Sequence, residues 1–419
     1  MNKKIIFTVI TALTISMVAL GRARNTDLVT HPGDFRDAVM SDSDESLKSA
    51  DFETGIPAIE PAGQNVYDPI PSPALNADPS AISATDAKAS DKKKDSFAVP
   101  YRVTGTVKKE GEGFSFVVAD GRTFKLLPAS LEIQKKAEQL AQTGASVTLD
   151  GWSRRLDDLS AMRADAFLDP ASNVTQTWRD KTQREPDLAS GGAGAFTVNN
   201  VRWGKTAGGD AYDWRTAVIN PALVENVYII QKPFPPEIIA SHAVMLFTFK
   251  AGGVMDSNGN ASRGLLLSVE AMLRKDKPVD LISSLKKEFH ILWLLTTEED
   301  YINFTCGVEN KKLLPYELLL SPGQKRALLE DAITQAVVNR RGEYYHTITN
   351  NCIITLIQLL NKVLPEASRI PLFYNPSLYN PQAAMPNTAF SGLVKKGLAA
   401  PHIPELTPAN YKDTSLWPK

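Results

Sequence analysis

Residues 349–365, TNNCIITLIQLLNKVLP, are the stretch on which the fold prediction depends most. Its apolar residues are Ile353, Ile354, Leu356, Ile357, Leu359, Leu360, Val363 and Leu364, and Pro365 follows them. This spacing predicts a buried amphipathic helix whose N-terminus is capped by Thr349, Asn350 or Asn351. Cys352 then falls in the first helical turn, where the helix dipole is expected to lower a thiol pKa. The position makes Cys352 a candidate nucleophile.

A histidine and a glutamate are expected to face each other on two earlier segments. ASHAVMLFTFKAGG, residues 240–253, and RGLLLSVEAML, residues 263–273, both have strand character, and the Gly- and Asn-rich residues between them predict a hairpin turn. His242 and Glu270 are symmetric about the turn, and facing cross-strand side chains lie about 5 Å apart at Cβ. Glu270 could then orient the imidazole of His242 and stabilise its charged form. The alternative, of equal weight, is that His242 caps a core strand while Glu270 points to solvent.

The chain has two cysteines, and the second one bears on the role of Cys352. In an oxidising compartment the pair could simply form one disulfide. Cys306 lies in YINFTCGVE, residues 301–309, which has the alternation of a strand. We predict that Cys306 is not the disulfide partner of Cys352, since a bridge would consume the nucleophile.

The N-terminus has the pattern of an export signal. Lys3 and Lys4 precede the uncharged, mostly apolar residues 5–20, and small residues follow. The apolar run is shorter than the roughly 20 residues that cross a bilayer, which favours cleavage over an uncleaved anchor. The sequence predicts a bacterial protein of the periplasm or cell envelope, either soluble or in peripheral contact with the membrane.

The predicted organisation is α+β and has six parts. Residues 1–24 are the signal peptide, and the Ser-, Asp-, Ala- and Pro-rich residues 25–97 are a disordered tether. Residues 98–170 predict five short strands and one helix, a small β-barrel of the oligonucleotide/oligosaccharide-binding (OB) type. A linker (171–195), the large domain (196–375) and a Pro- and Asn-rich C-terminal tail (376–419) follow.

Five segments of the large domain carry a resemblance to a known family. In order they are VNNVRWGKTAGGDAYDWRTAVINP, IIASHAVMLFTFKAGG, LLLSVEAMLRKD, LLPYELLLSPGQKRALLEDAI and EYYHTITNNC. Together they resemble the Lnb N-terminal periplasmic domain family over roughly residues 196–365, with SH, SVEA and TNNC as the most specific motifs. Such domains are similar to permuted papain-like thiol enzymes of the NlpC and lecithin:retinol acyltransferase groups, in which the histidine precedes the cysteine.

The resemblance implies a Cys-His-Glu site formed by Cys352, His242 and Glu270. The family's named member transfers a fatty acyl chain from phospholipid to bacterial lipoproteins, but it carries membrane-spanning helices, which are not expected here after the signal. Just before the cysteine, Tyr345 and His346 are expected at the rim of the site. Asn350 and Asn351 are also candidates for the rim.

Three functions remain open. The first is an envelope thiol acyltransferase or acyl hydrolase that acts on lipid or lipoprotein acyl groups. The second is a cell-wall cysteine peptidase or amidase that uses the same residues, and the third is a non-catalytic envelope binding module. The 46 basic and 47 acidic residues nearly balance, which argues against a nucleic-acid partner. The five scattered histidines lack metal-ligand spacing, and no motif predicts a cofactor.

Overall fold

The structure is a computed structural model that describes residues 98–154, 160–172, 182–192, 194–205, 211–234, 241–275, 279, 283–371 and 386–419. These residues all fall in one compact unit, Thr85–Lys419. They form a mixed α/β structure in which strands predominate. The predicted signal peptide and tether lie outside the described residues. Within the described part of the chain, no helix combines the length and apolarity that crossing a membrane requires.

The first five strands close into a small barrel. Its elements are β1 (Val99–Glu110), β2 (Gly113–Val118), β3 (Thr123–Pro128), α3 (Leu131–Thr143), β4 (Ser146–Ser153) and β5 (Ala161–Leu168). The strands pair in the closed order β1-β2-β3-β5-β4, with β3 and β5 parallel. Phe116, Leu149 and Met162 fill the interior. Gly144 ends α3 in the left-handed conformation, at φ 63°, which glycine adopts without steric cost. Five strands and one helix are present, as the sequence predicted.

The remaining strands form one larger sheet. They are β6 (Asp187–Gly192), β7 (Ala195–Lys205), β8 (Tyr212–Ile219), β9 (Val224–Pro233), β10 (Ser241–Phe249), β11 (Val254–Asp256), β12 (Ala261–Ser262), β13 (Gly264–Ala271), β14 (Ile291–Thr297) and β15 (Leu314–Glu317). The order is β12-β11-β8-β7-β14-β13-β10-β9-β15, and β6 pairs with β7. β14 is buried along its whole length.

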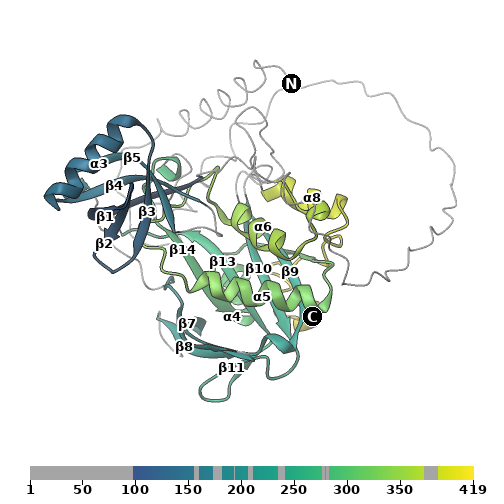
Figure 1. The fold of residues 1–419 in the computed structure, drawn as a ribbon. Helices are drawn as coiled ribbons and strands as arrows, with labels where there is room; N and C mark the ends of the chain where they lie inside the picture. Colours follow the sequence, from purple (N-terminus) through teal and green to yellow (C-terminus); the bar gives the residue numbers. More distant parts are fainter. Residues whose placement is uncertain are drawn as a thin grey trace, which may run out of the picture. The chain divides into compact units, whose positions relative to one another are not determined.

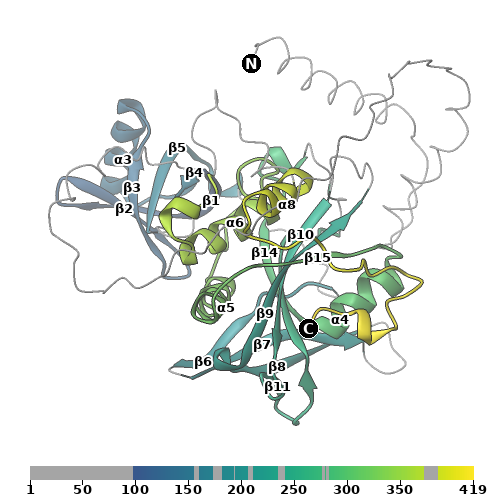
Figure 2. The same ribbon diagram turned by 90° about the vertical axis from the view of Figure 1, so that its right-hand side faces the viewer.

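The two faces of this sheet are covered by different helices. Odd-numbered residues of β10 and β13, such as Ala243 and Leu267, pack in the main core beneath α5 (Pro322–Ala336), α6 (Cys352–Val363) and α8 (Pro386–Lys395). Even-numbered residues, such as Val244 and Leu266, pack beneath α4 (Glu298–Ile302) and the C-terminal segment. Figures 1 and 2 show α5 and α4 on opposite sides of the sheet. Alternation along the strands therefore assigns each side chain to one of two separate cores.

The predicted pairing of the two central strands is right, but the predicted connection between them is wrong. β10 and β13 are antiparallel, and Val244 pairs with Ser268. The same register places His242 opposite Glu270. The connection is not a simple turn, because it contains β11 and β12, and β11 pairs with β8. Asp256 at the end of β11 accepts hydrogen bonds from Arg215, at 2.6 Å, and from Asn260, at 2.7 Å, which hold this excursion in place.

The strand predicted around Cys306 is also wrong. α4 continues directly into a π-helical turn, Asn303–Val308, that contains this cysteine. Thr297 caps α4 by accepting the N–H of Asp300, and three acidic residues occupy the first turn, where the helix dipole favours them. Tyr301, Ile302 and Cys306 all face one core, which is helical rather than strand spacing.

Both segments that flank the large domain carry structure. The stretch predicted as a linker, residues 171–195, includes β6. The described part of the C-terminal tail packs on the large domain: α8 contributes Phe390 to the main core, and Leu406 forms a β-bridge with Leu313.

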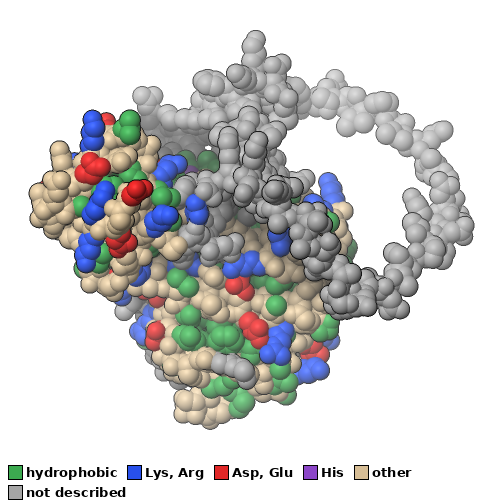
Figure 3. Space-filling view, viewed as in Figure 1, with side chains coloured by type: hydrophobic (Ala, Val, Ile, Leu, Met, Phe, Trp, Pro, Cys, Tyr) green, Lys and Arg blue, Asp and Glu red, His purple; other side chains and the backbone are tan. Residues whose placement is uncertain are grey.

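Charges of both signs are interspersed over the described residues on the face shown in Figure 3, so this face has no extended patch of one sign.

Candidate functional site

His242 lies at the second residue of β10 and is hydrogen-bonded across the sheet to β13. Its Nε2 lies 2.8 Å from the Oγ of Ser268, and Ser268 donates to Oε1 of Glu270 at 2.8 Å. The direct distance from Nε2 to the Glu270 carboxylate is 4.0 Å, too long for a hydrogen bond. Ser268 therefore bridges the two residues that the sequence paired.

The bridge fixes which ring nitrogen of His242 carries a proton. A serine hydroxyl has one hydrogen, and that of Ser268 is directed to Glu270, since a carboxylate can only accept. Ser268 must then accept from the ring, so Nε2 of His242 is protonated. In the neutral imidazole this leaves the lone pair on Nδ1, the nitrogen that can act as a base.

Glu270 is held in place by further polar contacts. Gln183 donates from Nε2 to Oε2 of Glu270 at 2.6 Å, and its Oε1 accepts the N–H of Leu273 at 2.8 Å. Burial pushes the pKa of Glu270 upward, but the charge of His242 and the hydrogen bonds from Gln183 and Ser268 outweigh it. The pKa stays below its usual range, so the carboxylate is ionised at neutral pH and stabilises positive charge on the imidazole.

Cys352 is the first residue of α6, as the sequence predicted. Asn351 is the N-cap, and its Oδ1 accepts the N–H of Ile354 at 3.0 Å. The backbone N–H groups of Ala243 and Ile353 lie close enough to the sulfur of Cys352 to lower the pKa of its thiol. The thiol thus lies among backbone donors at a helix start, where a developing negative charge is stabilised.

The expected fall in the Cys352 pKa is wrong in direction for this structure. Only 4% of the residue is exposed, and it packs in the main core with Ala243 and Leu356. This burial raises the pKa of the thiol and outweighs the surrounding hydrogen-bond donors. The thiol is therefore neutral at pH 7 in the structure as it stands, and an adjacent base is needed to activate it.

β10 links the histidine and the cysteine. The N–H of Ala243 lies near the Cys352 sulfur, and His242 is the preceding residue of the strand. Successive side chains of a strand point to opposite faces, so Ala243 packs toward α6 whereas the His242 ring lies with Ser268 on the other face. The sulfur is one peptide unit from the histidine backbone, near the end of the strand.

The four predicted rim residues have distinct positions. The Tyr345 side chain lies against Cys352 and lowers the pKa of its thiol. His346 organises the entering loop, because its Nδ1 accepts the N–H of Thr349 at 3.2 Å. Asn350 is buried and donates to the Tyr344 carbonyl at 2.9 Å. Tyr345 touches the candidate nucleophile, whereas His346, Asn350 and the cap Asn351 shape the loop before it.

Sequence reasoning missed Ser268 and Gln183. Ser268 could have been found, because it precedes Glu270 by two residues on a predicted strand and so shares its face. Gln183 lies in the stretch predicted as a linker, where no pattern indicated a contact with β13.

Both cysteines are free, which agrees with the prediction that they do not pair. Cys306 lies in the core on the far face of the sheet, and burial raises the pKa of its thiol to about 12.

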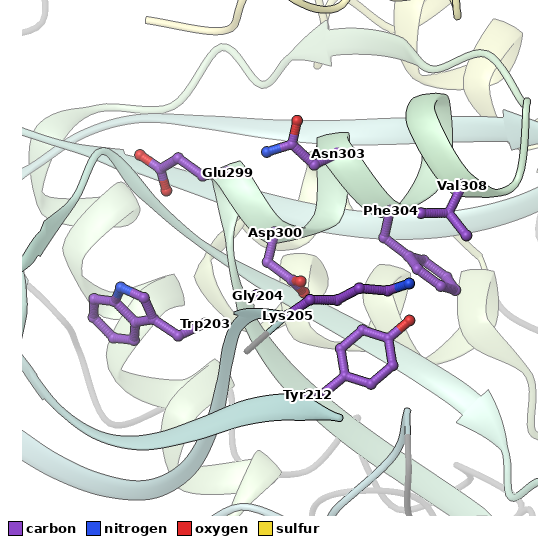
Figure 4. Close-up of a pocket in the computed structure, with 9 residues that line it drawn as sticks. All are labelled: Trp203, Gly204, Lys205, Tyr212, Glu299, Asp300, Asn303, Phe304 and Val308. Atoms are coloured by element: carbon purple, nitrogen blue, oxygen red, sulfur yellow. The ribbon is translucent and has the colours of Figure 1, made fainter. Parts of the chain in front are cut away.

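A cavity of about 220 Å³ lies beside β7, β8 and α4, and none of the predicted site residues lines it. Figure 4 shows Lys205, Tyr212 and Phe304 gathered on one side of it. Its wall includes Asp300, which accepts from Arg202 Nε at 2.6 Å in a buried ion pair. Among the described residues, no group of three or more His, Cys, Asp or Glu side chains could hold a metal ion.

Residues 210–378 match the family model of the Lnb N-terminal periplasmic domain, which confirms the resemblance drawn from the sequence. The matched segment contains His242, Ser268, Glu270, Tyr345 and Cys352. No curated protein and no solved structure matches the chain.

Proposed function

We propose, taking the match of residues 210–378 to the Lnb N-terminal periplasmic domain as the premise, that this chain is an exported envelope enzyme that transfers or hydrolyses acyl groups through a thiol. Cys352 is the nucleophile, His242 the general base and acid, and Glu270 orients the imidazole through Ser268. The observation that carries the proposal is the position of the Ala243 N–H, which lies close enough to the Cys352 sulfur to lower the pKa of the thiol. Because Ala243 follows His242 in β10, the thiol lies one peptide unit from the histidine whose ring Ser268 holds.

The reaction has two stages. In the first, the neutral imidazole of His242 takes the thiol proton as sulfur attacks the carbonyl carbon of an ester or amide. The C–O or C–N bond then breaks, and the imidazolium returns the proton to the leaving alcohol or amine. In the second stage an amine or water attacks the thioester, gives its proton to His242, and regenerates the Cys352 thiol as the acyl group departs.

Negative charge on the carbonyl oxygen develops close to the start of α6. The Cys352 N–H, which lies beside the Tyr345 side chain, would donate to this oxygen. Tyr345 would then supply a second donor. A contribution of this kind is worth about 10²–10³ in kcat for one donor in other acyl-transfer enzymes.

The fold assignments belong to the same proposal. The histidine precedes the cysteine, and the cysteine opens a helix that packs on an antiparallel sheet, which supports a permuted papain-like domain. The barrel order β1-β2-β3-β5-β4, with α3 between β3 and β4, supports an OB-like assignment.

An apolar rim favours acyl lipids or lipoproteins over cell-wall peptides as substrates. Leu285 and Ile348 are 41% and 38% exposed, and the N–H of Thr347 donates to the Ser284 carbonyl, so the two loops lie together near the start of α6. Exposed apolar side chains beside a nucleophile suit a hydrocarbon chain or a membrane surface.

The test is trapping of the acyl-enzyme. The chain would be incubated with p-nitrophenyl butyrate or with phosphatidylethanolamine vesicles, and its intact mass measured before and after hydroxylamine treatment. We expect a hydroxylamine-sensitive acyl adduct on Cys352 that is absent from Cys352→Ser and retained in the matched control Cys306→Ser. No adduct and no ester turnover in the wild-type chain would overturn the proposal; turnover of a cell-wall peptide alone would favour a peptidase.

A further inference from the structure

The segment that leads into the cysteine helix is paired on both of its edges. On one edge, Arg102 donates its N–H to the Gly342 carbonyl and Tyr344 donates to Pro100, each at 2.9 Å, so residues 342–344 extend the start of β1 in the barrel. On the other edge, Ile291 donates to the Glu343 carbonyl at 3.1 Å, at the start of β14. The segment is a single extended piece of chain between the barrel and the large sheet.

Barrel side chains hold the turn before this segment. Arg122 donates to the carbonyl of Arg341 at 2.9 Å and to that of Asn339 at 3.3 Å, while it also pairs with Asp120. A second NH1 contact, to the Tyr101 hydroxyl at 3.0 Å, fixes the guanidinium on the barrel. One arginine therefore uses its planar guanidinium to bind two carbonyl groups of this turn at once, which a lysine could not do in the same geometry.

Gly342 shows how close the two parts approach. Its φ of +93° is one that residues with a side chain rarely adopt, and a Cβ placed there would lie 2.1 Å from Cγ1 of Val103 in β1. Only glycine allows the segment to lie flat on the barrel strand.

The same segment contacts the site directly. Glu343, buried and paired with Arg340, accepts from Asn350 Nδ2 at 3.0 Å, and Asn350 precedes the N-cap of α6. Two residues after Glu343, the Tyr345 side chain lies against Cys352. A small displacement of the segment would therefore shift both Asn350, which precedes the N-cap of α6, and Tyr345, which lies beside the Cys352 thiol.

A second contact joins the barrel to the loops of the site. Lys287 donates to Oδ1 of Asp150 at 2.9 Å and to the Gly151 carbonyl at 3.0 Å, and the neighbouring Trp152 lies edge-on to the His346 ring. Residues of β1, β4 and the turn before β3 therefore contact segments of the chain that precede Cys352.

We propose that the barrel is a positioning module for the thiol site: β1 and Arg122 fix residues 339–345, and this sets Tyr345 and Asn350 against the start of α6. The inference rests on the proposed function for its catalytic consequence, but the positioning itself does not depend on a substrate. Arg122 acts through Tyr345 and is a positioning residue. The barrel in this role requires no ligand of its own.

The experiment compares two barrel arginines. Arg122 and Arg163 each pair with an aspartate two residues away, but the Arg163–Asp165 pair is more exposed to solvent than the Arg122–Asp120 pair. In Arg122→Ala, residues 339–345 lose their anchor on the barrel, and water should reach the sulfur. Because burial is the main cause of the raised Cys352 pKa, that pKa should then fall. We expect iodoacetamide to label Cys352 at least threefold faster, with the midpoint of its pH profile lowered, and ester turnover to fall.

The controls separate positioning from loss of structure. Arg163→Ala should leave Cys352 labelling and turnover unchanged, and Arg122→Lys should be intermediate. Cys306 labelling, followed by mass spectrometry in the same sample, should stay as slow as in the wild type. An unchanged Cys352 profile in Arg122→Ala, or an equal acceleration of Cys306, would overturn the inference.

The two proposals fail in different ways. If the wild-type chain turns over no acyl substrate but Arg122→Ala still alters Cys352 labelling as expected, the proposed function fails and the positioning inference stands. If Cys352-dependent turnover is found and labelling is unaffected by Arg122→Ala, only the positioning inference is lost.

Discussion

Ser268 is the residue on which the chemistry of His242 depends. It is fully buried, and it spans a gap of 4.0 Å that the imidazole and carboxylate do not close by themselves. Its single hydrogen, directed to Glu270, is what assigns the proton to Nε2 and the basic lone pair to Nδ1. The histidine and carboxylate alone do not define the tautomer.

Ser268→Ala should therefore lower kcat by about ten- to a hundredfold with little change in KM, the size of effect typical of residues that orient a functional group through a hydrogen bond. Steady-state ester turnover measures both constants. Ser115→Ala, at an equally buried serine of the barrel, is the control and should leave them unchanged. A wild-type kcat in Ser268→Ala would show that the tautomer is set in another way.

Glu298 is a buried carboxyl for which neither oxygen has a hydrogen-bond partner among the described residues. Burial raises its pKa to about 8, against a smaller opposing effect of Arg263. An unfolded glutamate has a pKa of about 4.3. Between these two values the folded chain binds one more proton than the unfolded chain, so the stabilising effect of that proton is complete below about pH 4 and is lost as pH rises through 8.

Glu298→Gln removes this titration. Thermal unfolding measured from pH 5 to pH 8 should show a smaller loss of Tm in the variant than in the wild type, with the variant gaining most at pH 8. Parallel Tm profiles for the two proteins would mean that Glu298 finds a partner or ionises in the folded state.

At the scale of elements, the parts of the fold that local patterns control were predictable. α6 follows from its apolar spacing and its cap, and the register of β10 with β13 follows from the symmetry of the residues around their connection. Contacts between distant segments were not predictable. Alternation alone could not tell that the residues around Cys306 wind into a π-helical turn, or that Gln183 reaches Glu270 across 87 residues of chain.

The residues of the candidate site were predictable from local patterns, but the pKa of Cys352 was not. Cys352, His242 and Glu270 could be named from sequence because each lies at a marked place in a local pattern. The raised pKa of Cys352 could not be predicted, because the helix start that lowers a thiol pKa is visible in the sequence whereas the burial that raises it is a tertiary effect.

The cap of α6 provides a test at this scale. Asn351→Ala removes the bond to the Ile354 N–H and a second one to the Thr347 carbonyl, and it should cost about 1–2 kcal/mol of unfolding free energy. Urea denaturation measures this loss. Ser321→Ala, at the capping box of α5, should cost a similar amount but leave the labelling rate of Cys352 unchanged, whereas Asn351→Ala should alter it. Equal Cys352 labelling rates in both variants would mean that the cap does not influence the thiol.

For the whole molecule, the question is whether the chain works at a lipid surface. Leu285 and Ile348 project from two loops beside the site, and Leu319, at 56% exposure, is an apolar side chain of the same kind near β15. A single exposed apolar side chain is common on protein surfaces. Two of them on adjoining loops next to the candidate nucleophile form a surface that an acyl chain or a bilayer could cover. Leu319 therefore serves as the matched control.

The double variant Leu285→Asp, Ile348→Asp should lower turnover of a phospholipid presented in phosphatidylethanolamine vesicles by about tenfold or more. Complete burial of each apolar side chain contributes roughly 1.5–3 kcal/mol to binding, whereas burial of an aspartate is unfavourable. Turnover of soluble p-nitrophenyl butyrate should change less than twofold, because the short ester needs no surface to bind. Leu319→Asp should affect neither substrate. Equal losses on both substrates would mean that the loops support the site itself, and no loss on either would remove the reason for preferring lipid acyl donors over peptides.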